Sequence, residues 1–128
     1  MRIKTLSIVE TAYRATLEEQ DDTILWLNRS LQGAGADVDL LLKGNAVNYA
    51  VAEQDASGLA FGAERQTQPP RLADDVAKLI AAGAAVYIVD EDAVERGIRN
   101  DELLPGVQRV GTAGVAPLIA GYDRVWHW

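Results

Sequence analysis

The sequence contains no cysteine and only one histidine, His127. The absence of thiols excludes disulfides, thiolate nucleophiles, thiolate zinc sites and iron–sulfur clusters. One histidine cannot build a histidine-rich metal site, and the sequence has no GxSxG motif that would supply a serine nucleophile. We therefore expect no metal and no cofactor, and we identify no catalytic residue from the sequence.

Basic residues are also scarce: 12 lysines and arginines stand against 19 aspartates and glutamates, for a net charge of −7. This charge opposes the phosphates of nucleic acids and of anionic membranes, so we expect neither as a partner. Long hydrophobic runs are missing as well. The N-terminal MRIKTLSIVETAY lacks the apolar core of a signal peptide, and no run approaches the length of a membrane span. These features predict a soluble, cytoplasmic protein.

The sequence does contain a regular alternation of apolar strands and helices. Strand-like segments rich in β-branched or other apolar residues span 2–9, 37–44, 85–89, 107–110 and 123–128. Helical segments span 17–35, 45–52, 69–84, 90–96 and 112–122. The alternation predicts a single domain over residues 1–128 in the α/β class. We expect a mainly parallel five-stranded sheet with helices on both faces, as in flavodoxin-like three-layer folds.

Some local features refine this prediction. In the first helix, Ile24, Leu27 and Leu31 form a buried stripe, and Asp21 or Asp22 caps the start. Residues 54–70 show no clear period and are predicted to form the longest loop. Pro117 weakens the last helix, because proline lacks the N–H that a helix interior needs.

Ligands of parallel α/β sheets bind beyond the carboxyl ends of the strands. Polar residues follow three predicted strands at that edge. The predicted ligand crevice consists of Glu10, Lys43, Asn45, Asn48, Asp90 and Glu91. An anion could bind the N–H groups after Lys43, but no complete phosphate-binding motif is present. An ordinary strand-to-helix turn with Asn45 as N-cap explains the same residues.

Three consecutive acids, Asp90, Glu91 and Asp92, stand where the third predicted strand meets a helix. As a structural feature, Asp90 is the N-cap and accepts the N–H of Asp92 or Ala93, while the other two acids oppose the positive end of the helix. The alternative is a catalytic or metal-binding cluster, which would need further oxygen ligands such as Glu10.

Aromatic residues crowd the end of the chain, where Trp126 and Trp128 flank His127. On a strand, His127 points away from both tryptophans. We interpret this segment as packing at the end of the sheet or as a subunit contact, because aromatic side chains are favoured at interfaces.

Four stretches resemble the DsrE/DsrF/DsrH-like family of small sulfur-relay proteins. They are DVDLLLKGNAVNYAVA (37–52), VYIVDEDAVERGI (86–98), ELLPGVQRVG (102–111) and YDRVWHW (122–128). The resemblance implies a compact, mostly parallel five-stranded fold. It also implies homo-oligomers, as trimers or hexamers, or hetero-oligomers with other DsrE-like proteins.

In active members of that family, a cysteine just after the third strand carries a persulfide, and the matching position here is Asp90. A carboxylate cannot hold a persulfide, because the chemistry needs a thiolate. The resemblance therefore implies a cysteine-free member that is structural or binds a partner or ligand, associated with sulfur metabolism or sulfur relay. The alternatives are a small-molecule or anion-binding protein, and an enzyme that uses Asp90, Glu91 or Glu10 as acid or base.

Overall fold

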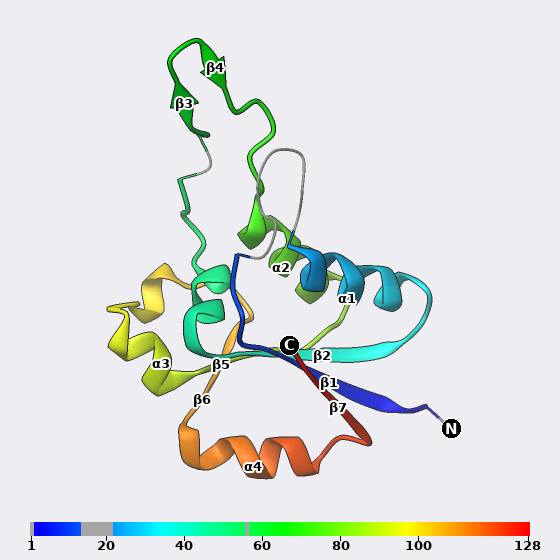
Figure 1. The fold of residues 1–128 in the computed structure, drawn as a ribbon. Helices are drawn as coiled ribbons and strands as arrows, with labels where there is room; N and C mark the ends of the chain where they lie inside the picture. Colours follow the sequence, from blue (N-terminus) through cyan, green and yellow to red (C-terminus); the bar gives the residue numbers. More distant parts are fainter. Residues whose placement is uncertain (1, 14–21, 56) are drawn as a thin grey trace.

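The computed structural model describes residues 2–13, 22–55 and 57–128. Five strands form one sheet in the order β6-β5-β2-β1-β7 (Figure 1). They are β1 (Lys4–Val9), β2 (Asp37–Leu42), β5 (Val86–Val89), β6 (Gln108–Val110) and β7 (Arg124–His127). Every pair of neighbours in this sheet is parallel. The predicted α/β fold with a parallel five-stranded sheet is confirmed.

Helices cover both faces of the sheet, also as predicted. Helices α1 (Thr23–Gly33) and α2 (Leu72–Ala81) lie above it, and α4 (Thr112–Ala120) lies below it (Figure 1). The 3₁₀ helix η1 (Gly44–Ala50) packs against α2 and against α3 (Asp90–Glu95). Another 3₁₀ turn, η2 (Asn100–Glu102), precedes β6.

The core is unequal on the two faces. A large buried cluster fills the space between the sheet and the α1, α2 and η1 layer, and it includes Tyr49, Leu79 and Ile88. A smaller cluster on the other face joins Leu6, Ile8, Leu41 and Val89 to partly buried residues of α4. The central strand β2 contributes Leu40 and Leu42 to one cluster and Leu41 to the other, which explains its nearly continuous apolar sequence.

Helix α1 differs in detail from its prediction. Of the two proposed caps, Asp22 is the N-cap, and its side chain accepts the N–H groups of Ile24 and Leu25. Asp21 and the predicted helical residues up to it, 17–21, lie outside the described residues. The buried face is formed by Ile24, Leu25 and Asn28, whereas Leu27 and Leu31 of the predicted stripe are only half-buried.

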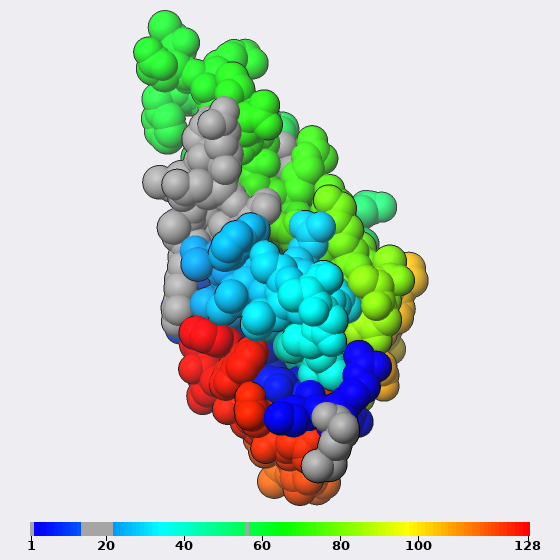
Figure 2. Space-filling model, turned by 90° about the vertical axis from the view of Figure 1, so that its right-hand side faces the viewer, coloured from blue at the N-terminus to red at the C-terminus, as the bar shows by residue number. Residues whose placement is uncertain are grey.

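The predicted loop over 54–70 contains a short hairpin made of β3 (Ala60–Phe61) and β4 (Glu64–Arg65). The hairpin projects from the body of the protein in Figures 1 and 2. Its side chains meet no core, so the sequence shows no apolar period there. Pro117 lies inside α4, as its position in the sequence suggested.

Candidate functional site

The carboxyl ends of the parallel strands meet at one edge of the sheet, and this edge carries the predicted site residues. Glu10 follows β1, Lys43 follows β2 and Asp90 follows β5. Because neighbouring parallel strands end together, Lys43 and Glu10 lie close: Nζ of Lys43 is 3.9 Å from Oε2 of Glu10. The six predicted residues do not all contact one another, however. They divide into separate small networks.

The first network surrounds Glu10. Its Oε1 lies 2.8 Å from Nε2 of His127, the last residue of β7. The side chains of His127, Glu10 and Lys43 are 54%, 46% and 36% exposed, so water competes for every contact in this group. Exposed ion pairs of this kind contribute about 0–1 kcal/mol.

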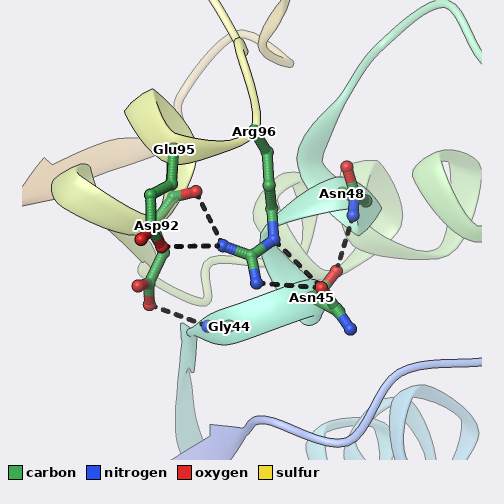
Figure 3. Close-up of polar contacts among 6 residues, drawn as sticks. All are labelled: Gly44, Asn45, Asn48, Asp92, Glu95 and Arg96. Carbon is green, nitrogen blue, oxygen red and sulfur yellow. Dashed lines mark hydrogen bonds and ion pairs between the residues drawn. The ribbon is translucent and has the colours of Figure 1, made fainter.

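The second network joins α3 to η1 (Figure 3). Nε and one terminal nitrogen of Arg96 donate to Oδ1 of Asn45, at 3.0 and 2.9 Å. The other terminal nitrogen donates to the carbonyl oxygen of Asp92, and Asn48 donates its amide to the carbonyl of Asn45. The prediction that Asn45 is an N-cap is wrong. The helix η1 begins at Gly44, and its N-cap is Lys43, whose side chain makes no capping hydrogen bond.

Asp92 completes this network from the helix side. Its Oδ2 accepts the N–H of Gly44 at 2.7 Å. Gly44 has a φ of +57°, a left-handed conformation in which a side chain is strained. A glycine at this turn thus lets η1 begin directly beneath the carboxylate of Asp92.

The third network corrects the prediction for Asp90. Its side chain forms no cap bond, and the N-cap of α3 is Val89. The Asp90 carboxylate instead accepts the Nε–H of Arg109 on β6, and a second nitrogen of Arg109 donates to Asn100. Asp90 is drawn out of the capping position because a guanidinium of the neighbouring strand offers a charge-assisted bond.

Glu91 belongs to a fourth contact, at the start of α4. Its Oε2 accepts the N–H of Thr112 at 2.7 Å. This hydrogen bond to Thr112 holds the pKa of the Glu91 carboxyl below its ordinary value. Each of the three acids therefore binds a different element: Asp90 binds β6, Glu91 binds the start of α4 and Asp92 binds η1.

These contacts engage polar groups that a ligand could otherwise bind. Four of the cavities in the described part of the chain have volumes of about 140, 240, 290 and 310 Å³, and none of these four is lined by the six predicted residues. Among the described residues, no group of three or more His, Asp or Glu side chains is arranged to hold a metal ion.

Sequence reasoning missed the residues that organise this edge, namely Arg96 and Arg109. Arg96 binds Asn45 at a separation of 51 residues and Arg109 binds Asp90 at a separation of 19 residues, so no local spacing reveals these two contacts. One signal was present for Arg109: it is a charged residue inside the predicted strand VQRV, directly before Val110. A charge in such a place calls for a partner of opposite sign on the neighbouring strand.

A second missed group is buried beneath α1. The hydroxyl of Tyr49 donates to Oδ2 of Asp22 at 2.6 Å and accepts the N–H of Tyr13. Burial and the bond to Asp22 raise the pKa of the Tyr49 hydroxyl far above its ordinary value. Because Asp22 also caps α1, this group serves to join α1 to η1.

The sequence and the structure were each compared with those of known proteins. No family model and no curated protein matches the sequence. The structure resembles the YchN protein of E. coli with a TM-score of 0.73 and 19% identity, over 98% of this chain and 99% of that one. It also resembles MTH1491 of Methanobacterium thermoautotrophicum, a protein of unknown function, with a TM-score of 0.61 and 17% identity, over 97% and 98% of the two chains.

The architecture defines a class, the parallel α/β proteins that place their strand ends at one polar edge. Within that class, the likeness to YchN shows that this chain has the DsrE-like fold. No helix among residues 2–13, 22–55 and 57–128 is long and apolar enough to cross a membrane.

Proposed function

We propose that this chain is an assembling subunit of the DsrE-like type that binds copies of itself or related chains and carries no sulfur. The observation that carries the proposal is the residue after β5. The family resemblance places a persulfide-bearing cysteine there, whereas this chain has Asp90, held by Arg109. No cysteine exists elsewhere to replace it.

Exposed apolar side chains support the assembling role. Leu59 and Phe61, on the projecting hairpin, are 63% and 73% exposed. Large apolar side chains exposed on a projecting element do not stabilise a monomer, because they bury no surface there. Such side chains are typical of protein–protein contacts. The DsrE-like fold is what supports an association with sulfur metabolism.

The two other candidate functions are less well supported. An anion site near Lys43 and Asn45 would need free donors, but Lys43 faces Glu10 and Asn45 is engaged by Arg96. An acid or base at Asp90 or Glu91 would need a carboxyl whose pKa is raised by burial. Glu91 is exposed and its pKa is lowered, while the Asp90 side chain is 42% exposed.

Intact mass measurement after incubation with a persulfide donor and desalting tests the absence of sulfur carriage. We expect the purified chain to gain no sulfur, because it has no thiol acceptor. The variant Asp90→Cys restores a thiol at the family's carrier position, and we expect it to gain one sulfur atom. Stable sulfur on the parent chain would contradict the proposal. Failure of Asp90→Cys to gain sulfur would contradict the match of this position to the carrier cysteine.

A further inference from the structure

The strand β7 lies at the edge of the sheet and is paired on one side only among the described residues. On its inner side, β7 forms parallel main-chain hydrogen bonds with β1 over its whole length. The N–H of Trp128 donates to Ile8 and the N–H of Glu10 donates to the carbonyl of Trp128. In a parallel pair, alternate residues direct their main-chain groups to the partner. Arg124 and Trp126 therefore face β1 with their main chain, while Val125 and His127 direct theirs outward.

The side chains of β7 divide between the two faces of the sheet. Val125 and His127 pair in register with Leu6 and Ile8 of β1, whose side chains belong to the α4 face. Arg124 and Trp126 pair with Thr5 and Ser7 and so lie on the α1 face. Figure 2 shows the residues of β7, in red, at the surface below α1.

This edge lacks two of the features that usually prevent pairing with another chain, although the strand is short and carries the charge of Arg124. Arg124–His127 contains no proline and no lysine, and Val125 at its centre is 39% exposed. The opposite edge strand, β6, has three residues against four in β7. The outer side of β7 is thus the longer open strand edge of the sheet.

The residues Arg124, Val125 and Trp126 are complementary to themselves in the antiparallel direction. In this pairing Val125 stands opposite Val125 of a second copy. Arg124 faces the partner's Trp126 on the α1 face, a cation–π pairing. The outward main-chain groups of the two Val125 residues then exchange both of their hydrogen bonds.

Asp123 and His127, on either side of these residues, are engaged within their own chain. Asp123 accepts the N–H of Lys4 with Oδ2, and Nε2 of His127 lies 2.8 Å from Oε1 of Glu10. Next to this edge, a cavity of about 310 Å³ is lined by Ile3, Val38, Arg124 and Trp126, and the partner's Trp126 would cover its rim.

From this geometry we propose that β7 pairs antiparallel with β7 of a second copy of this chain, about a two-fold axis at Val125. The pairing joins two five-stranded sheets into one continuous sheet. A two-fold contact of this kind is closed, so it yields a defined assembly instead of a fibre. The inference rests on the proposed function, since it names the surface and the partner through which the chain assembles.

Cross-linking through one introduced thiol tests the pairing, because the chain has no other cysteine. In Val125→Cys the two thiols would stand opposite each other, with Cα atoms about 5.5 Å apart, which a disulfide can span. The control is Val94→Cys on α3, since Val94 is 65% exposed. Under mild oxidation we expect Val125→Cys to form disulfide-linked dimers at least about tenfold faster than the control. Equal rates, or no dimer from Val125→Cys, would overturn the proposal.

A proline at the same position tests the main-chain bonds. Val125→Pro removes an outward N–H and no bond to β1, a placement that edge strands tolerate. We expect this variant to have half the parent's mass in sedimentation at equal concentration, whereas Val125→Thr, which keeps the N–H, has the parent's mass. A folded Val125→Pro variant that keeps the parent's mass would overturn the pairing. If the variant does not fold, the cross-linking result decides.

These outcomes separate the surface from the function. If the parent chain assembles but either change at Val125, in a folded variant, lacks its expected effect, the β7 pairing is wrong and the proposed function stands. If the parent chain is a monomer, both are wrong.

Discussion

At the scale of single residues, the acids after β5 act as connectors between elements. Asp90, Glu91 and Asp92 are consecutive, yet each contacts a different part of the chain: β6, α4 and η1. Their carboxylates hold the start of α3 to its neighbours. In the described part of the chain they are not arranged as a group that could hold a metal ion.

The pairing of Asp90 with Arg109 predicts the outcome of a double-mutant cycle. Asp90→Asn and Arg109→Gln each remove one charge, and the two together remove the pair. Because the side chains are 42% and 21% exposed, we expect a coupling free energy of about 0.2–1 kcal/mol in urea unfolding.

The same cycle discriminates the pair from a helix cap. If Asp90 were a cap, Asn would replace it without loss, since asparagine caps about as well as aspartate. A neutral Asp90→Asn change with no coupling to Arg109 would contradict the ion pair.

Glu91 predicts how stability depends on pH. Its pKa in the folded chain is below the ordinary value because the carboxylate accepts the N–H of Thr112. A carboxyl with a depressed folded pKa adds stability above its unfolded pKa, about 4.3, and loses that contribution as pH falls through the folded value.

The comparison is between the parent chain and Glu91→Gln in thermal melts across pH. We expect the parent to be more stable at neutral pH, with the difference shrinking as pH falls below about 4.3. A difference that is constant with pH would show that Glu91 does not stabilise α4 through its charge.

Residue contacts of this type were only partly predictable from the sequence. The positions of Glu10, Lys43 and Asp90 at one edge followed from parallel strands ending together. Their partners did not follow, because Arg109 lies 19 residues beyond Asp90 and Asp92 binds Gly44 across 48 residues. The N-cap prediction for Asp90 used local geometry alone, and a longer-range charge decided the contact.

At the scale of elements, α1 shows how one buried acid fixes a helix. Asp22 is fully buried, caps α1 through Ile24 and Leu25, and accepts the hydroxyl of Tyr49. Capping and the link between α1 and η1 thus depend on the same carboxylate.

Replacing that carboxylate should be costly. For Asp22→Ala we expect a loss of about 2–4 kcal/mol in the free energy of unfolding, since a cap and a charged hydrogen bond are both removed. Asp22→Asn keeps an acceptor for the cap and should lose less, and Tyr49→Phe should lose about 1 kcal/mol. Denaturant unfolding measures all three. An Ala variant as stable as the Asn variant would contradict the capping role.

Elements with a strong apolar pattern were predictable, and the others were not. The sequence of β2 indicated a strand covered on both faces, and both core clusters confirm it. The hairpin of β3 and β4 escaped prediction because each strand has two residues and all four are exposed. An element with one buried face has apolar residues at regular intervals in its sequence. An exposed element has no such pattern, so the sequence does not predict it.

At the scale of the whole molecule, the order β6-β5-β2-β1-β7 places β7 at the edge and brings every strand end to one side. The polar edge is satisfied by internal contacts. Exposed apolar side chains are spread over several elements: Leu59 and Phe61 at the hairpin, Val125 on β7, Trp26 on α1 and Val94 on α3. These surfaces are the basis for proposing that the chain assembles with other copies.

Light scattering of the purified chain at micromolar concentration tests most directly whether it is an assembling subunit. We predict a mass that is an even multiple of 13.8 kDa, with a hexamer as the expected form, because the two-fold contact through β7 pairs the copies. A single species of 13.8 kDa across that concentration range would contradict the assembling role.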